Sequence, residues 1–538
     1  MKKIGLIAVL SVMVCSAWAV PARRGEIVKT QPDGTQIVVY QHGDEHFHWM
    51  TNEKGEWLKM DVDGFYRVTE ALSVEQIEAR RVASSKRAAM AAYPLNIAPR
   101  GLVILVNFAD VAFETEKAEM DSMLTGKNYT RDYSYFYRGK KQSITSKGSA
   151  WQYFYDSSNG HYDPQFDVIG PVTVSKNMAY YGKNVNDFDA APWTMVKEAC
   201  QLVDDSVDFK QYDNNNDGYV DFVYVIYAGY GEADGGDKNT IWPHSYWLLE
   251  AGITCKLDGK CVDLYACGNE MDSRTNYHTG IGTFCHEFSH VLGLPDLYET
   301  TGYGTYKTIG AWSILDYGPY NNDGNTPPAY SAYEQFFMGW LMPRLIVDAE
   351  NVELEELQAS NSALLISSSD QHNLIGNDPK PTTFYLLENR QQVGWDEYLP
   401  GHGLMLTKVQ YDYNKWTNNT VNNSSNRMGV DLIEADGKKP NSSSNGYTGK
   451  AGDLFPAGAT EYLGITNHSI EDVSEQDGII YFKYRGGIAT STEQVQTEET
   501  IVAIYNILGQ KQAAVDIESL PHGTYVVVTT AGSKKIVR

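Results

Sequence analysis

The residues between His286 and Asp296 have the types and the spacing needed to bind a catalytic metal ion. Two histidines, His286 and His290, stand four residues apart, and Glu287 follows the first of them. Residues four apart lie one turn above each other on a helix, so both imidazoles reach one metal ion. Glu287 lies about 100° round the same helix. From there its carboxylate reaches a water on the metal rather than the metal itself.

The residues after the helix complete the site. Catalytic zinc uses three protein ligands and keeps one position open. Gly293 permits a sharp exit from the helix, after which the chain turns back and presents Asp296 as a third ligand. Glu299 and Glu334 are alternative acids farther along the chain. Zinc acidifies a bound water, and Glu287 takes the proton of that water and delivers it to the leaving group. The pattern predicts a zinc hydrolase site.

The sequence around this motif predicts the elements that position it. The apolar run 101–108 is typical of a buried strand, and it opens a mixed segment with a helix near 193–207 and a strand over 221–228. Turn signals in 20–97 indicate a hairpin-rich β unit that ends in a charged helix near 73–92. Strand patterns return from about 346, and the Asn/Ser-rich stretch 418–445 predicts a long mobile loop.

We therefore predict a multidomain α+β protein whose central unit has a twisted sheet over a long metal-bearing helix. Its parts are a signal peptide at 1–19, a β-rich N-terminal segment at 20–98, the metal-binding unit at 99–345, a β-rich sandwich-like unit at 346–486 and a small β unit at 487–538.

The N-terminus and the charge indicate export. Lys2 and Lys3 precede an apolar run over 4–14, and Ala17-Trp18-Ala19 supplies a cleavage signal, so the mature chain is expected to start at Val20. The formal charge of −24 argues against nucleic acid or an anionic membrane as the partner. No later segment is apolar enough to span a bilayer. Disulfides are compatible with export, and the mature chain has an odd number of cysteines: Cys200, Cys255, Cys261, Cys267 and Cys285.

A second stretch, 213–221, has the layout of the first nine positions of a calcium loop. Oxygen side chains fall at positions 1, 3, 5 and 9, with a glycine at 6 and a backbone carbonyl at 7. The position that normally carries a bidentate glutamate is Tyr224. An Asn/Asp-rich turn without a metal is the alternative. The predicted calcium ligands are Asp213, Asn215, Asp217, the Tyr219 carbonyl and Asp221.

The run His286–Tyr298, HEFSHVLGLPDLY, resembles the signature of the immune-inhibitor-A-like metallopeptidases, relatives of the metzincins. The resemblance extends over about 25–480, and its motifs occur in the family's order at 31–35, 42–49, 103–110, 151–172, 213–231 and 328–340. It implies a metzincin-like catalytic unit, zinc bound by the three residues named above, protein or peptide substrates and synthesis as a latent precursor.

The resemblance also places a turn beneath the metal at Ser313–Gly318, with Leu315 where metzincins carry methionine. Leucine fills the same apolar floor. Tyr317 matches a tyrosine that stabilises the oxyanion in some metzincins, and a packed aromatic is the alternative.

The resemblance further implies that 20–98 is a pro-region. Candidate residues for blocking the metal are Asp44, Glu45, His46 and His48, and candidate sites for its removal are Arg80, Arg81 and Arg100. The stretches 505–510, 520–525 and 534–538 are similar to the C-terminal sorting domain of type IX secretion, which implies export machinery as a partner; a small adhesive β module is the alternative.

The expected function is a secreted zinc endopeptidase. The competing reading is a zinc-containing cell-surface binding protein or adhesin that keeps a peptidase scaffold. The intact Glu287 argues against this alternative, because a binding protein needs no general base. Cleavage preference, disulfide pairing and oligomeric state stay open at this point.

Overall fold

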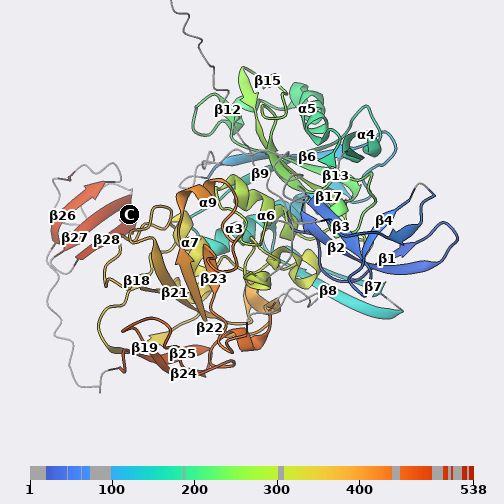
Figure 1. The fold of residues 1–538 in the computed structure, drawn as a ribbon. Helices are drawn as coiled ribbons and strands as arrows, with labels where there is room; N and C mark the ends of the chain where they lie inside the picture. Colours follow the sequence, from blue (N-terminus) through green and yellow to red (C-terminus); the bar gives the residue numbers. More distant parts are fainter. Residues whose placement is uncertain are drawn as a thin grey trace, which may run out of the picture. The chain divides into compact units, whose positions relative to one another are not determined.

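The structure is a computed structural model that divides into two compact units, residues 1–487 and 488–538 (Figure 1). It describes residues 20–44, 47–61, 63–72, 98–137, 139–185, 188–300, 308–438, 449–487, 501–506, 511–512, 524–529 and 532–537. The predicted signal peptide, the charged helix at 73–92 with two of the candidate processing arginines, and Glu45 and His46 lie outside the described residues.

The N-terminal part of the first unit is an antiparallel five-stranded meander. Its strands are β1 (Ile27–Thr30), β2 (Gln36–Asp44), β3 (Phe47–Thr51), β4 (Trp57–Met60) and β5 (Tyr66–Val68). The turn between β1 and β2 contains Gly34, whose φ of 85° is in the left-handed region that glycine tolerates. Short tight turns of this kind explain why the segment forms hairpins rather than helices.

The metal-binding part is built on a twisted sheet in the order β14-β17-β13-β6-β9, in which only the edge strand β14 runs antiparallel. The strands are β6 (Arg100–Asn107), β9 (Gln165–Thr173), β13 (Val223–Tyr230), β14 (His244–Trp247) and β17 (Leu264–Met271). Alternate residues of β6 enter two different hydrophobic cores, Val103 and Leu105 one core and Leu102 and Ile104 the other, so both faces of the sheet are covered.

Helices cover the two faces. α5 (Pro192–Val203) packs over one face, while α3 (Ala150–Ser157) and the histidine-bearing α6 (Gly282–Val291) pack over the other. The predicted long metal-bearing helix is wrong in length, because α6 has only ten residues. It is buried throughout, with Phe284 and Phe288 packed in the core, so its stability comes from tertiary contacts rather than length.

The remaining elements of this part connect or flank the sheet. They are α2 (Lys117–Thr125), the hairpin β7 (Thr130–Tyr137) and β8 (Lys140–Lys147), α4 (Met178–Gly182), β10 (Asn184–Val185), β11 (Phe188–Asp189), η1 (Asp204–Ser206), η2 (Phe209–Tyr212), β12 (Tyr219–Val220), η3 (Glu232–Asp234), β15 (Cys255–Leu257), β16 (Lys260–Val262), η4 (Gly310–Trp312), η5 (Gly318–Gly324) and α7 (Ala332–Met338).

The following β-rich part shares a hydrophobic core with the metal-binding part. Phe384, Met405 and Trp416 belong to the same buried cluster as Phe288 and Leu292. The two parts therefore pack as one compact unit. Its elements are β18 (Arg344–Leu345), β19 (Glu350–Leu354), α8 (Leu357–Ser360), β20 (Leu364–Ile366), β21 (Thr383–Arg390), η6 (Gly394–Tyr398), β22 (Gly403–Gln410), α9 (Tyr413–Thr417), β23 (Val430–Leu432), η7 (Ala451–Asp453), β24 (Ile470–Gln476) and β25 (Ile479–Tyr484).

The stretch 418–445, predicted as a long mobile loop, is irregular over 418–429 and 433–438 in its described part, but it packs against its neighbours. Asn419 and Asn422 are buried, and β23 adds to the edge of a five-stranded sheet. The Asn422 amide donates to the carbonyls of Leu297 and Val430 at 2.7 and 2.8 Å. Asparagine is common in loops because its amide satisfies backbone groups, and here it does so in a buried position.

The second unit contains an antiparallel three-stranded sheet of β26 (Ile501–Asn506), β27 (Thr524–Thr529) and β28 (Gly532–Val537). Nowhere in the described residues is there a helix with the length and apolar character needed to span a membrane.

Candidate metal centre and the segment that covers it

The C-terminus of α6 turns the chain back toward the two histidines. The Leu294 N–H donates to the Ser289 carbonyl at 3.1 Å, and the Gly293 N–H donates to the His290 carbonyl at 2.8 Å. This pair of bonds is the Schellman motif, which needs a left-handed residue after the helix. Gly293 meets that requirement with a φ of 97°. The turn brings Asp296 beside the histidines.

The three predicted zinc ligands converge in a buried group. The Nε2 atoms of His286 and His290 are 3.0 Å apart, and both lie near Asp296 Oδ1, at 3.3 and 3.2 Å. All three side chains are at most 1% exposed. They are the one group of three or more potential metal-ligating side chains that comes together within the described part of the chain.

Backbone carbonyls orient both imidazole rings. His286 Nδ1 donates to the Ile314 carbonyl at 2.7 Å, and His290 Nδ1 donates to the Leu294 carbonyl at 2.8 Å. A carbonyl only accepts, so each Nδ1 carries the proton and each Nε2 presents a lone pair. Two Nε2 lone pairs and the carboxylate oxygen Asp296 Oδ1, which has no hydrogen-bond partner, therefore face one another. This donor set fits zinc and leaves a fourth position open.

A second pair of bonds fixes the carboxylate ligand. The Asn419 amide donates to Asp296 Oδ2 at 2.6 Å, and its carbonyl oxygen accepts from the Asp296 N–H at 2.8 Å. Asp296 is thus held with Oδ1 turned toward the histidines.

The turn at Ser313–Gly318 lies against the metal centre. The Ile314 carbonyl that orients His286 belongs to it, and Leu315 is fully buried. Glu334, an alternative third ligand, instead caps α7 and accepts from the Ser313 hydroxyl, so its carboxylate anchors the turn. Glu299 is not part of the three-ligand group. Tyr317 is half-buried, with the guanidinium of Arg24 3.7 Å from its ring centroid.

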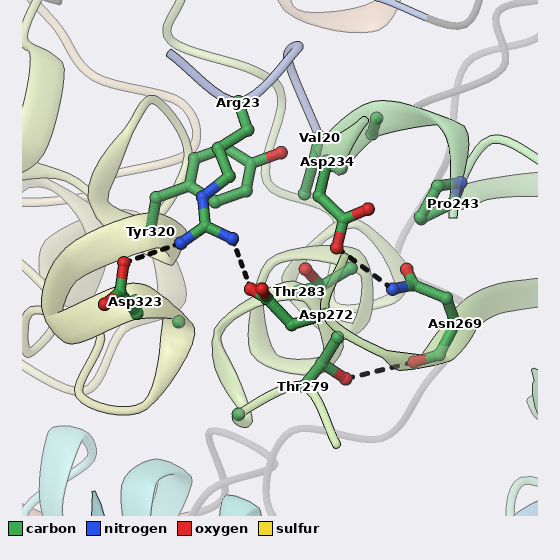
Figure 2. A pocket seen from close by; sticks show the side chains of 13 residues that line it. Val20, Arg23, Asp234, Pro243, Asn269, Asp272, Thr279, Thr283, Tyr320 and Asp323 are labelled. Atoms are coloured by element: carbon green, nitrogen blue, oxygen red, sulfur yellow. Dashed lines mark hydrogen bonds and ion pairs between the residues drawn. The ribbon is translucent and has the colours of Figure 1, made fainter. Parts of the chain in front are cut away.

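The N-terminal residues of the described chain cover Glu287. The Val20 N–H donates to Glu287 Oε1 at 2.9 Å, and both residues are buried. Val20 is held by Trp242, whose indole N–H donates to the Val20 carbonyl at 3.1 Å. The Tyr320 hydroxyl donates to the Pro21 carbonyl at 2.6 Å. The segment therefore lies against the predicted general base through Val20, and Figure 2 shows Val20 and Arg23 of this segment beside Tyr320.

The described candidates for blocking the metal have other contacts. His48 Nε2 lies 3.1 Å from Glu232 Oε1, and the His48 ring stacks on Trp242. Burial lowers the pKa of His48, but Glu232 outweighs this effect and raises it to about 9. Asp44 is buried, and neither Asp44 nor His48 joins the metal-ligand group. The covering role falls instead to the residues around Val20.

The predicted calcium loop is compact and largely satisfied by its own contacts. Asp213 accepts from the Asp217 and Gly218 N–H groups at 3.0 Å each and forms an ion pair with Lys260. Asp221 accepts from the Asn214 N–H at 2.6 Å, while its buried Oδ1 has no hydrogen-bond partner. Burial raises the pKa of Asp221 to about 6. The exposed Tyr219 follows in β12, and Asn215 lies in the same turn.

The cysteines take no part in the metal centre. All five described cysteines are buried and free. The thiols of Cys200 and Cys255 hydrogen-bond to each other. The disulfides that export would allow are therefore not formed among them.

Several residues around the centre were not singled out in the sequence. Trp242, Tyr320 and Asn419 contact the metal centre or its covering segment from positions distant in sequence. Only Asn419 stood in a stretch of unusual composition, which indicated a loop rather than a contact. Val20 was identified only as the expected start of the mature chain, which gave no indication of its place beside Glu287.

Comparison with known proteins agrees with this geometry. Residues 98–342 match the family model described as "Immune inhibitor A peptidase M6, catalytic domain". The chain is 27% identical over 293 residues to "Pre-pro-metalloprotease PrtV" from two strains of Vibrio cholerae serotype O1, an alignment that covers 48% of this chain and 31% of the relative. It is 28% identical over 268 residues to "Immune inhibitor A" of Bacillus thuringiensis subsp. alesti, covering 44% and 39%.

The pairwise alignments cover 31% and 39% of the length of these relatives. Residues 98–342, which match the family model, contain the histidines of α6 and Asp296. Residues 98–342 are thus a metallopeptidase domain of the peptidase M6 type, for which zinc is the implied metal.

Proposed function

We propose that this chain, with its peptidase M6 domain at residues 98–342, is a secreted zinc endopeptidase that is made as a latent precursor. One observation carries the proposal. Two imidazole nitrogens and one carboxylate oxygen converge in a buried group, with a buried glutamate next to the first histidine. A structural zinc site needs four protein ligands, whereas three ligands beside a general base are typical of catalysis.

The proposed mechanism assigns one role to each side chain. His286, His290 and Asp296 would hold the zinc ion, which when bound would supply the Lewis acidity that makes a water more acidic and polarises the scissile carbonyl. Glu287 removes the proton from that water and delivers it to the leaving amine. The Ile314 and Leu294 carbonyls keep the imidazole rings in place during the reaction. For Tyr317 we propose oxyanion stabilisation, supported by its place in the same turn as the Ile314 carbonyl that accepts from His286.

Latency is the second part of the proposal. The Val20 N–H forms a hydrogen bond with the Glu287 carboxylate, which is the proposed general base. Removal of residues 1–19 would turn this N–H into the α-ammonium group of the mature chain, which adds a full positive charge to the contact with Glu287. The precursor then has its general base neutralised by its own N-terminus. Activation requires removal of this segment, and cleavage at Arg80, Arg81 or Arg100 would detach it from the domain.

Export and calcium complete the proposal. We propose that residues 487–538 act as a type IX sorting domain read by export machinery, supported by their motifs and their separation as a small unit. Calcium binding at 213–221 is supported by the spacing of the oxygen side chains and by the buried, unpartnered Oδ1 of Asp221. Calcium would displace the Lys260 ammonium from Asp213. A rise in melting temperature with calcium that Asp221→Asn abolishes would support the site.

The decisive experiment uses casein as an unstructured substrate and the activated protein with and without a zinc chelator. The isosteric variant Glu287→Gln keeps a side-chain acceptor but removes the base. We expect chelator-sensitive cleavage that falls by roughly 10²–10⁴-fold in Glu287→Gln while zinc content is retained. Full activity in Glu287→Gln would contradict the mechanism. Bound zinc with no cleavage after removal of the pro-region would favour the binding-protein alternative.

A further inference from the structure

Arg23 of the covering segment enters a buried acidic pocket next to the metal centre. Its guanidinium donates through Nη1 to Asp272 and through Nη2 to Asp323, the latter at 2.7 Å (Figure 2). The Arg23 side chain is only 8% exposed. The two carboxylates accept from different nitrogens of the guanidinium, and they come from different segments, one directly after β17 and the other in η5. With Arg23 in place, the remaining cavity is about 20 Å³, room for a single water.

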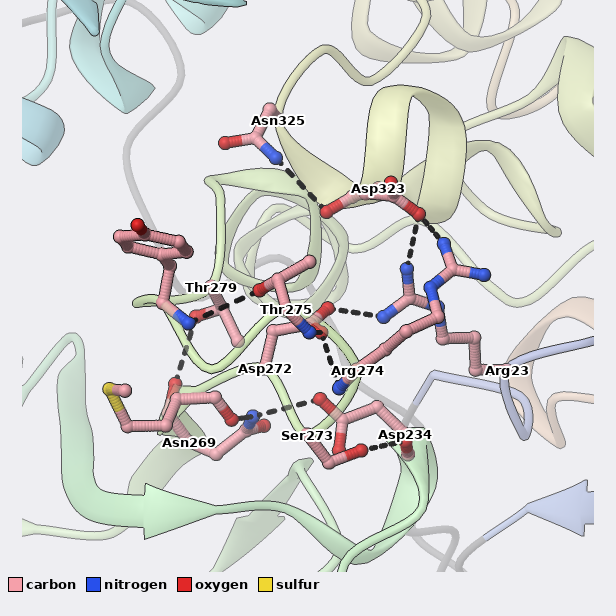
Figure 3. Close-up of polar contacts among 12 residues, drawn as sticks. Arg23, Asp234, Asn269, Asp272, Ser273, Arg274, Thr275, Thr279, Asp323 and Asn325 are labelled. Carbon is pink, nitrogen blue, oxygen red and sulfur yellow. Dashed lines mark hydrogen bonds and ion pairs between the residues drawn. The ribbon is translucent and has the colours of Figure 1, made fainter. Parts of the chain in front are cut away.

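The pocket contains more carboxyl groups than cationic side chains. A third carboxylate, Asp234, is 8% exposed and bonds to Asn269 through Oδ2 at 3.3 Å, while its Oδ1 has no hydrogen-bond partner. Arg274 pairs with Asp323 and is the other cation in this cluster (Figure 3). Three carboxyl groups therefore face two arginines while Arg23 is present and one arginine after it leaves.

The charges of these groups depend on Arg23. Burial opposes ionisation of Asp272, but Arg23 outweighs it and lowers the pKa of this carboxyl. Burial and the charge of Asp272 raise the pKa of Asp234 to about 8, and Arg23 opposes that rise. A buried carboxylate without a countercharge is costly. The vacant pocket therefore favours any cation that replaces the guanidinium.

The covering segment indicates which residue of a bound peptide would reach this pocket. General-base catalysis requires Glu287 to hand its proton to the leaving amine, and the Val20 nitrogen lies at that carboxylate. Val20 thus stands where the first residue after the scissile bond would lie. The Arg23 N–H donates to the Ala233 carbonyl at 2.8 Å, as a bound peptide backbone would. Counted along the chain from Val20, Arg23 is the fourth residue.

We propose that the pocket formed by Asp234, Asp272 and Asp323 is a substrate subsite that selects a basic side chain at the fourth residue after the cleaved bond. This inference rests on the proposed endopeptidase function. In the precursor Arg23 occupies the subsite, and activation vacates it. Arginine fits better than lysine, because one guanidinium bonds two carboxylates through different nitrogens, whereas an ammonium acts as a single point charge.

The test is a set of peptides that differ only at this position. The activated enzyme is given peptides with arginine, lysine, alanine or glutamate at the fourth residue after the bond, and mass spectrometry of the products identifies the bond that is cut. We expect kcat/KM to fall in that order, with arginine roughly tenfold to a hundredfold above alanine. A ratio near one would overturn the subsite, and would mean that the pocket only anchors Arg23 in the precursor.

Variants of the pocket separate its charge from its structure. Asp323→Asn and Asp234→Asn keep the side-chain shape but remove one ionisable carboxyl group each, so the arginine-to-alanine ratio of kcat/KM should shrink. Asp472→Asn is the matched control, since Asp472 is an exposed carboxylate paired with Lys483 far from the pocket. An unchanged ratio in both pocket variants would overturn the proposal. If a variant does not fold, the peptide series on the unaltered enzyme still decides.

The failure of the function and the failure of the subsite give different results. No cleavage of casein or of any peptide, or cleavage that persists in Glu287→Gln, would contradict the endopeptidase proposal. Cleavage that depends on Glu287 but ignores the fourth residue would contradict the subsite alone.

Discussion

Replacing Asn419 should weaken zinc binding although Asn419 is not a ligand. Asn419 makes two hydrogen bonds to Asp296, one to its carboxylate and one from its backbone N–H, and it is 4% exposed. Its φ of 51° is left-handed, so alanine would add backbone strain. Asn419→Gly removes both hydrogen bonds while tolerating this φ. It is therefore the cleaner perturbation.

The magnitude follows from the two bonds. A hydrogen bond to a charged group contributes about 1.5–3 kcal/mol and a neutral one about 1 kcal/mol. Part of this loss affects folding and part affects the orientation of Asp296 Oδ1 toward the histidines. Loss of an outer partner of a metal ligand typically costs about 10–100-fold in affinity. We expect a loss in this range for Asn419→Gly. The loss should be larger for Asn419→Asp, which places a carboxylate against Asp296 Oδ2.

The assay is a zinc dissociation constant from competition with a chromogenic chelator, together with melting temperatures of the zinc-free and zinc-loaded protein. Asn418→Gly is the matched control, because Asn418 is exposed and its amide donates to the Asn414 carbonyl at 2.8 Å rather than to Asp296. Wild-type zinc affinity in both Asn419 variants would refute the reasoning. It would mean either that Asp296 needs no support or that it is not a ligand, and Asp296→Asn would distinguish these cases.

Three further predictions concern the rest of the first unit. His48 bonds Glu232 across the contact between the N-terminal meander and the metal-binding part, and its pKa is about 9 when docked against 6.5 ordinarily. Protonation of His48 therefore stabilises the docked state by about 3 kcal/mol at most. This contribution is fully present below pH 6.5 and is lost as the pH rises through 9. Size-exclusion chromatography of the trypsin-nicked precursor should show release of the N-terminal fragment at pH 9.5 but not at pH 6, and His48→Gln should remove this difference. Arg390→Leu should lower the free energy of unfolding by roughly 3–5 kcal/mol in a denaturant titration, because it leaves the buried Asp396 carboxylate without the two 2.7 Å hydrogen bonds from Arg390. The exposed control Arg344→Leu should change the free energy of unfolding by less than about 1 kcal/mol. Gly293→Val should cost about 1–3 kcal/mol through strain at its φ of 97° and should reduce bound zinc as measured by metal analysis; normal zinc content would show that Asp296 does not depend on this turn.

The parts of the centre that the sequence predicted are those set by local geometry. The spacing of His286 and His290 places both on one helix face, and Gly293 allows the turn that returns the chain to Asp296. These residues lie close together in the sequence, and over such short stretches the backbone geometry of a helix and its C-terminal turn determines where the side chains point. The continuous apolar run 101–108 likewise predicted a buried strand, which is β6, although not that its two faces enter separate cores.

The contacts that the sequence did not predict join residues far apart in the chain. Asn419 meets Asp296 across 123 residues, and Val20 meets Glu287 across 267. An asparagine-rich stretch has the same composition whether its amides face water or a buried backbone, so composition could not distinguish a mobile loop from a clamp.

The covering segment joins two properties that are usually considered separately. A segment that blocks a peptidase must bind the cleft well enough to exclude substrate, so it uses the contacts that substrate would use. Val20 at Glu287 and Arg23 in the acidic pocket meet this condition, because the N–H groups of both residues form hydrogen bonds with the domain and the Arg23 guanidinium binds Asp323. Arg23→Ala should therefore weaken latency and leave peptide selectivity after activation unchanged, whereas Asp323→Asn should weaken both. Loss of only one of the two in Asp323→Asn would show that latency and substrate selection use different contacts.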